Sequence, residues 1–263
     1  MFFNQKKRLI NFIFLIGNLM HSSCIISKNA IIHDNVSIGP HTIIHDNVEI
    51  FENTIIGAFC EIGVATPLAN DKKLIIGKNS LIRSHSIFYI GSKFGDHLKT
   101  GHNVCVRENI SAEDHVQIGT SSELQGDTII GNNSRFQSNV FIPKQTIIKD
   151  FVWLMPNVVL TNDPTPPSDY EKGPTIHSFS VVAANATILP EVIIEENCLI
   201  AAGSVLTTNT EKDSFYVGVP AKRVGHISEI FLKDKKTSAY PWTSHFKRGY
   251  PDEILKNWVA DKN

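Results

Sequence analysis

The chain has 263 residues, which is enough for one extended domain with a continuous core. Its 25 basic and 26 acidic residues give a net charge of −1, without the basic excess of a nucleic-acid-binding domain, so no nucleic-acid partner is expected. The four cysteines form no CxxC pair, which excludes a zinc knuckle and favours a reducing, cytoplasmic setting.

Residues 1–20 carry a basic patch followed by a short apolar run. The run is shorter than the roughly 20 apolar residues that span a bilayer, and no small-residue cleavage site follows it. We therefore interpret residues 1–20 as an N-terminal extension, either a cap or the product of a start codon upstream of Met20. Stable membrane insertion is not expected.

A six-residue period organises most of the chain. From Ile76 to Leu160 every sixth residue is apolar except Thr100, and most residues four places further on are small or β-branched. A helix has a period of 3.6 and an ordinary strand a period of 2, so neither gives this spacing. The period is typical of a parallel β-helix, in which each hexad forms one short strand and one corner.

Two shorter blocks, Ile26 to Ile62 and Ile176 to Leu206, share this period. Gly39, Gly57 and Gly63 directly follow inward positions of the first block. We expect them to occupy tight corners, where positive φ costs glycine little. Two of the cysteines fall in the small-residue series and are expected to be buried thiols, namely Cys60 and Cys198.

Two segments interrupt the period, residues 64–73 and residues 161–174, and the second contains four prolines. Both are expected to leave the coil as loops, where function tends to collect. The C-terminal segment 226–263, which is rich in aromatic residues, is expected to form short helices that cap the open end of the coil. The sequence thus predicts an all-β fold, with a β-helix over residues 21–225 and a helical tail over residues 226–263.

Residues eighteen apart should lie above one another on successive coils. The eighteen-residue spacing predicts one outward polar column, with His102 beside it. It also predicts a second column, on the edge that carries the loop of residues 161–174. We expect this polar strip to lie next to the loop and to form a sugar-binding site. The first column contains His85, Asn103, Ser121, Asn139 and Asn157; the second contains Glu108, Gly126, Lys144 and Asn162.

The hexads, the Asn162-Asp163 pair on a loop and the sequence VGVPAKRV (217–224) resemble the left-handed β-helix acyltransferases. The segments 100–109, 136–143 and 158–167 are most similar to bacterial nucleotide-linked amino-sugar N-acetyltransferases. The resemblance implies a left-handed coil and a homotrimer that holds acetyl-coenzyme A between neighbouring prisms. It implies a dTDP- or UDP-linked amino-sugar as acceptor, for surface glycan synthesis, and no metal.

Acyl transfer to an amine needs a neutral amine, a held thioester and a stabilised oxyanion. His102 is a candidate general base because it titrates near neutrality, although the coenzyme sulfur is an alternative proton acceptor. The residues predicted to be catalytic are His102, Asn139, Asn162 and Asp163. Those predicted to bind the acceptor are His85, Glu108, Gln125 and Gln137.

The last block of hexads is similar to the segments that line the pantetheine arm in this family. Small residues there are expected to admit the arm and to offer N–H donors, and a basic pair is expected near the coenzyme phosphates. The predicted donor-binding residues are Ala183, Ala184, Ala201, Ala202, Gly203, Lys222 and Arg223. Relatives usually have glycine at the positions of Met155, Ala183 and Glu191, so the acyl group is left open between acetyl and longer chains.

Four alternatives were weighed. Lipid A-type O-acyltransferases share the length and the helical C-terminus, but their His-rich central signature is absent from the sequence. Serine acetyltransferases carry a large helical domain before the repeats, which disfavours them. A zinc carbonic anhydrase is suggested only by the spacing of His97 and His102. A scaffold without catalysis would need neither the Asn-Asp loop nor the donor segments.

Overall fold

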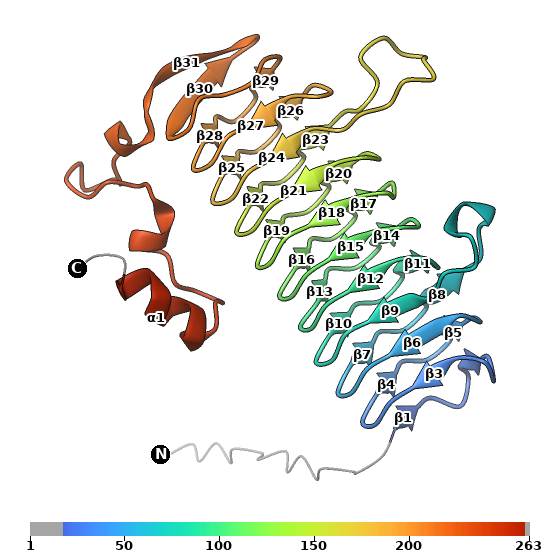
Figure 1. Ribbon diagram of the computed structural model, residues 1–263. Helices are drawn as coiled ribbons and strands as arrows, with labels where there is room; N and C mark the ends of the chain where they lie inside the picture. The colour runs from blue at the N-terminus through green and yellow to red at the C-terminus, as the bar shows by residue number, and fades with distance from the viewer. Residues whose placement is uncertain (1–17, 261–263) are drawn as a thin grey trace, which may run out of the picture.

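The computed structural model describes residues 18–260, which form a triangular prism of three parallel sheets with a tail along one side (Figure 1). Between β1 and β29, strands pair with the third strand along the chain, and partners lie eighteen residues apart wherever no loop intervenes, as Lys99 opposite Gln117 and Gln117 opposite Arg135. The molecule is a left-handed parallel β-helix. The predicted fold class is confirmed.

The three faces are named here by their sheets. Face 1 contains β1 (Leu19–Met20), β4 (Ser37–Ile38), β7 (Ile55–Ile56), β10 (Leu81–Ile82), β13 (Lys99–Thr100), β16 (Gln117–Ile118), β19 (Arg135–Phe136), β22 (Trp153–Leu154), β25 (Val181–Val182), β28 (Leu199–Ile200), β30 (Ser214–Gly218) and β31 (Ala221–His226). Face 2 contains β2 (Ile25–Ile26), β5 (Ile43–Ile44), β8 (Glu61–Val64), β11 (Ile87–Tyr89), β14 (Cys105–Val106), β17 (Glu123–Leu124), β20 (Phe141–Ile142), β23 (Val159–Leu160), β26 (Thr187–Ile188) and β29 (Val205–Leu206). Face 3 contains β3 (Ile31–Ile32), β6 (Val48–Ile50), β9 (Leu74–Ile76), β12 (Lys93–Phe94), β15 (Ser111–Ala112), β18 (Ile129–Ile130), β21 (Ile147–Ile148), β24 (Thr175–Ile176) and β27 (Ile193–Ile194).

The core is one continuous column of the sixth-residue side chains from all three faces. The small residues four places later complete it and are buried too. Several of these residues carry hydroxyls, which donate to carbonyl oxygens of the next coil, as from Thr42 to Gly57 at 2.7 Å, or of their own corner, as from Ser86 to Arg83 at 2.9 Å. Cys60 is buried in this series, as predicted. The stack therefore buries its polar atoms with partners.

The corners turn at the residue three places after each inward position, not at the glycines. Asn103 (φ 55°) and His85 (φ 62°) are two of many residues with positive φ there. Gly63 also has positive φ, but the expectation for Gly39 and Gly57 was wrong. A Cβ on Gly57 would lie 2.5 Å from the Ser84 nitrogen, and one on Gly39 would lie 2.7 Å from the Ala58 nitrogen. These two glycines give room to the coil above.

The coil already includes Leu19–Met20, which pair with Ser37–Ile38. The rest of the predicted N-terminal extension lies outside the described residues. At the other end, the β30–β31 hairpin extends face 1, so its strands follow β28 at the top of the sheet. The predicted loops leave after β8 and β23, and the first contains a short 3-10 helix, η1 (Pro67–Ala69).

The tail does not cap the open end as expected. It contains the 3-10 helices η2 (Ile227–Glu229) and η3 (Trp242–Ser244) and the helix α1 (Asp252–Ala260), and it folds back along the prism (Figure 1). The Trp242 indole donates to the Phe179 carbonyl oxygen and the Trp153 indole to the Tyr250 hydroxyl, both at 3.0 Å. Outward aromatic residues on the coils therefore hold the tail against the side of the prism.

Candidate functional site

The three corners of the prism divide the predicted site residues. Edge A joins face 1 to face 2, edge B joins face 2 to face 3, and edge C joins face 3 to face 1. In one coil these edges are residues 83–86, 90–92 and 95–98. Edge A holds His85, His102, Gln137, Asn139, Ala183, Ala184, Ala201, Ala202 and Gly203; edge B holds Glu108, Gln125, Asn162 and Asp163.

The polar column of His85 and Asn139 was expected to lie beside the loop of residues 161–174. It lies instead on edge A, whereas the loop leaves the coil at edge B. A step of eighteen residues keeps a side chain on its edge, whereas a step of six moves it to the next edge. His102 and Glu108 differ by six and lie on different edges. Within one prism, face 2 separates the two groups of predicted residues.

On edge A, His102 is exposed and its ring is oriented by a neighbour one coil below. Its Nδ1 lies 2.8 Å from the Ser84 hydroxyl oxygen, and Nε2 has no hydrogen-bond partner within the part of the chain that is described. The side-chain amide of Asn139 donates from Nδ2 to the side-chain oxygen Oδ1 of Asn157 at 3.2 Å. This edge presents a titratable imidazole and a ladder of amides to the outside.

On edge B, Glu108 is fully buried and pairs with the guanidinium of Arg107, which donates from Nε at 3.1 Å. Arg107 also lies over the Tyr89 ring, 5.0 Å from its centroid. Glu108 thus orients Arg107 and does not reach the surface itself. Sequence reasoning had singled out Glu108 and missed Arg107, whose position directly before Glu108 was the available signal.

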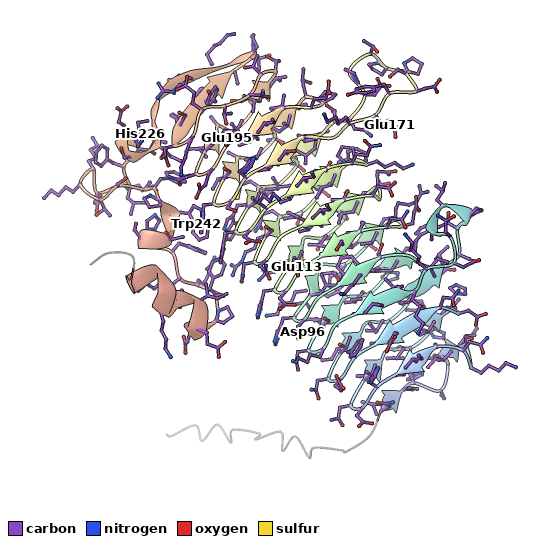
Figure 2. All side chains as sticks on the ribbon, viewed as in Figure 1. Asp96, Glu113, Glu171, Glu195, His226 and Trp242 are labelled. Carbon is purple, nitrogen blue, oxygen red and sulfur yellow. The ribbon has the colours of Figure 1, made fainter. Side chains whose placement is uncertain are left out.

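A cavity of about 230 Å³ opens on edge B, and Glu171 on its rim projects on the loop side of the prism (Figure 2). It combines two cations with the Glu171 carboxylate and amide side chains. Because Arg107 is already paired with Glu108, Lys144 is the cation that a negatively charged part of a polar ligand would meet. The lining residues are Arg107, Gln125, Phe141, Pro143, Lys144, Asn162 and Glu171. The structure brings two of the predicted residues together here, Gln125 and Asn162.

The second predicted catalytic residue of the loop, Asp163, holds the loop in shape. Its carboxylate accepts hydrogen bonds from the Thr165 amide at 2.9 Å and from the Ser168 amide and hydroxyl at 2.8 Å. Desolvation acts to raise the pKa of Asp163, but the bonds from Ser168 and Thr165 outweigh it and lower this pKa. The described contacts of Asp163 are those of a residue that positions its neighbour Asn162.

Glu191, one of the three positions where the resemblance led us to expect glycine, ties the same loop to the coil above. Its amide donates to the Lys172 carbonyl oxygen at 3.1 Å, and its carboxylate accepts from the Tyr170 hydroxyl at 2.6 Å. The Lys172 ammonium lies 3.6 Å from the same carboxylate. The C-terminal half of the loop over the edge B cavity is therefore fastened to the coil above.

The predicted donor segment on edge A offers fewer amides than expected. The amides of Ala183, Ala201 and Gly203 already donate to carbonyl oxygens of the coil, at 2.8 to 2.9 Å. Those of Ala184 and Ala202 donate no hydrogen bond among the described residues and stay available. Small side chains keep this strip open, and a Cβ on Gly203 would meet no atom within 4 Å.

The predicted phosphate-binding pair lies on β31, and its two members differ. The Arg223 guanidinium is already engaged, because its Nε lies 3.0 Å from the Ser214 hydroxyl and 3.0 Å from the Glu211 carboxylate. Lys222 is exposed and forms no ion pair with any described residue. Of the two, Lys222 is the cation that remains available to an anionic ligand.

A second cavity, about 300 Å³ and almost wholly apolar, separates the tail from face 1. Its floor includes Met155 and Ala183, and its roof includes Trp242 of the tail. Figure 2 shows Trp242 on the side of the prism away from Glu171. This space adjoins the predicted donor segment.

The histidines that suggested a zinc site do not converge. His97 lies on edge C, where its ring stacks on His115 with centroids 4.4 Å apart, and His102 lies on edge A. Within residues 18–260 there is no group of three His, Cys, Asp or Glu residues placed to hold a metal ion. The same residues contain no helix of sufficient length and apolarity to cross a membrane.

The bacterial transferase hexapeptide family (six repeats) matches residues 29–63 and 173–208. These two segments, in the first and last blocks of hexads, are similar to transferase hexapeptide repeats. A serine acetyltransferase of Buchnera aphidicola is 34% identical over 77 residues, covering 29% of this chain, and the bifunctional protein GlmU of Clostridium acetobutylicum is 27% identical over 154 residues, covering 59% of it. The chain spans 28% and 32% of the length of these two relatives.

Among solved structures, the UDP-N-acetylglucosamine acyltransferase of Arabidopsis superposes with a TM-score of 0.67 at 14% identity, covering 92% of this chain and 88% of its own. A further UDP-N-acetylglucosamine acyltransferase gives a TM-score of 0.52 at 17% identity, with 79% and 73% covered. At these identities the likeness concerns the fold. The resemblance of this hexapeptide-repeat chain to the left-handed β-helix acyltransferases is confirmed.

Proposed function

We propose that this hexapeptide-repeat protein is an acyltransferase that moves an acetyl group from acetyl-coenzyme A to the amine of a nucleotide-linked amino-sugar. The cavity on edge B carries the proposal, because it sets Arg107 and Lys144 beside the amides of Gln125 and Asn162. Cations of this kind suit the phosphates of a sugar nucleotide, and amides suit sugar hydroxyls. The repeat match and the acyltransferase fold support the reaction class.

The donor would lie along edge A, where the amides of Ala184 and Ala202 are available and Lys222 offers a cation for its phosphates. The acceptor nitrogen forms the amide bond to the carbonyl carbon as the carbon–sulfur bond breaks, and the electron pair leaves on sulfur. His102, oriented by Ser84, is placed to take the amine proton through Nε2; otherwise the proton passes to the thiolate. Backbone amides would hold the developing oxyanion.

Because edges A and B are separated within one prism, we propose a homotrimer in which edge A of one subunit faces edge B of its neighbour. This arrangement joins the donor strip, His102 and the edge B cavity in one groove. It places each catalytic centre between two copies of the chain, consistent with closed cyclic symmetry. We assign the protein to the cytoplasm, where sugar nucleotides and coenzyme A are available, and to surface glycan synthesis.

The decisive experiment measures thiol release by the purified protein with acetyl-coenzyme A and a panel of dTDP- and UDP-linked amino-sugars. Turnover of one amino-sugar, with Lys144→Gln raising KM for it roughly five- to tenfold, is the expected result. Lys28→Gln is the matched control, since Lys28 is an exposed lysine on the same edge, below the first loop and outside the cavity.

The panel includes UDP-N-acetylglucosamine with short and long acyl donors, because the solved structures of similar fold are acyltransferases of that sugar nucleotide. Transfer only to a hydroxyl of this compound would replace N-acetyl transfer by O-acyl transfer. Failure of all acceptors, with Lys144→Gln binding sugar nucleotides as well as the wild type, would reject the edge B assignment.

A further inference from the structure

A third cavity, of about 390 Å³, lies on face 1 beside edge C, away from the proposed active site. Its floor is a column of three outward side chains on successive coils, Lys99, Gln117 and Arg135. The stacked rings of His97 and His115 line one wall. Residues 249–253 of the tail close the other side, so the cavity exists only because the tail docks there.

The charge of this cavity is unbalanced. Arg135 is only 6% exposed, and no carboxylate pairs with it among the described residues. Its two terminal nitrogens donate to the carbonyl oxygens of Arg248 and Gly249, while its Nε has no partner within the described part of the chain. Glu253 is the single carboxylate in the lining, against the two cations Lys99 and Arg135. A buried cation without a counter-ion is costly unless a ligand supplies one.

The two imidazoles can add further positive charge. Burial and then the neighbouring His97 lower the pKa of His115, with a smaller opposing effect from Asp114. The nearby carboxylates of Asp96 and Asp114 accept hydrogen bonds from backbone amides of the coils below them, at 3.0 and 2.7 Å. A bound anion would favour the protonated ring of His115 and would itself be held more tightly by it.

The helix α1 also favours an anion in this cavity. Pro251 and Glu253, at its start, line the cavity, so the positive end of the nine-residue helix faces this space. The amides of Ile254 and Leu255 donate to the Pro251 carbonyl oxygen. This leaves those of Asp252 and Glu253 as the first-turn donors for phosphate oxygens among the described residues. Helix, guanidinium, ammonium and imidazole groups thus converge from three parts of the chain.

We propose that this cavity binds a phosphorylated small molecule through Lys99, Arg135 and the His97–His115 pair. Its volume leaves space for an organic group beyond the phosphoryl oxygens. Since Arg135 and residues 249–253 contact the same space, the ligand would fasten the tail to the prism. The site is independent of the proposed acyl transfer.

The test uses the full chain and inorganic phosphate as the probe, with affinity measured by isothermal titration at pH 6 and pH 7.5. We expect binding that is tighter at pH 6 and a phosphate-dependent rise in Tm. Lys99→Gln and His115→Asn should each weaken binding about tenfold, as expected for loss of one charged contact. Asn is chosen because His115 has φ of 60°, which asparagine tolerates.

Two lysine variants serve as controls. Lys93→Gln removes an exposed charge from face 3, and Lys222→Gln removes the cation proposed for the donor phosphates. Both should retain wild-type affinity for phosphate. Phosphate affinity unchanged in Lys99→Gln and His115→Asn, lost instead in Lys222→Gln, or absent from the wild type at pH 6 would overturn the proposal.

Discussion

The guanidinium carbon of Arg135 lies 3.7 Å from the centroid of the Tyr250 ring, joining the fourth coil of the long block to the segment of the tail directly before α1. The same group lies 5.1 Å from the Trp153 ring centroid and donates to two tail carbonyl oxygens. Burial and these contacts connect two segments more than a hundred residues apart. Arg135 therefore helps to fix where the tail docks, together with the aromatic contacts of Trp153 and Phe179.

Replacing Arg135 by methionine should release the tail while leaving the coil folded. The cation–π contacts and the charged hydrogen bonds suggest a loss of about 2 kcal/mol in tail docking. Tryptophan fluorescence and limited proteolysis of the tail are the measurements. Arg83→Met, at an exposed position of edge A, is the control. A tail as protected in Arg135→Met as in the wild type would contradict this role.

Gly57→Ala should destabilise the coil far more than Gly203→Ala. At residue 57 the new methyl group would lie 2.5 Å from backbone nitrogen, which cannot move without shifting a strand. At residue 203 it meets open space, and only the positive φ of 69° costs energy. We expect losses of about 3 kcal/mol and about 1 kcal/mol, measured by urea denaturation. Equal losses would show that close packing of the coils is not limiting.

Mixing two inactive variants should restore activity if the catalytic groove lies between subunits. His102→Ala disables edge A and Asn162→Ala disables edge B, and we expect each alone to lose most of its activity. After co-refolding in equal amounts, about a quarter of the interfaces would combine two intact edges. Recovery of about a quarter of wild-type activity is the expected outcome, and no recovery would place both edges' functions within one chain.

The stability of the fold should fall on acidification in a way that depends on His115. Its pKa is lowered by burial and by His97, so the unfolded chain binds a proton more readily than the folded one. The unfavourable contribution is absent above the ordinary value of 6.5 and grows as the pH falls below it. His115→Asn should therefore lose less stability than the wild type between pH 7.5 and pH 5, as measured by urea denaturation without phosphate. Parallel curves for the two proteins would refute this linkage.

The fold could be predicted from the sequence because side-chain size repeats every six residues, with a large apolar residue followed four places later by a small one. Ile82 and Phe88 fill the core, and Ser86 fits the corner, as their spacing indicated. The function of the glycines was misjudged because two requirements, positive φ and close approach, both select glycine. At Gly57 only the structure shows that the coil above is the cause.

The site was harder to predict. The eighteen-residue spacing shows which side chains stack in one column, but it does not show which columns lie next to one another. Asn162 and Glu108 were correctly placed on one edge. His102 precedes Glu108 by only six residues, yet it lies on another edge. The course of the tail left only a faint signal. Phe151 and Phe179 stand at corners where the other coils mostly have polar residues, and these aromatic rings are what the tail covers.

Both loops leave the coil at edge B, after β8 and β23, with β11, β14, β17 and β20 between them on face 2. Five strand spacings of about 4.8 Å set these loops roughly 24 Å apart. Adding or deleting eighteen residues between them would change that distance by one spacing and keep both loops on the same edge. A change of six residues would turn one loop to another edge. The separation of the two loops can therefore change only in whole coils if both are to stay on edge B.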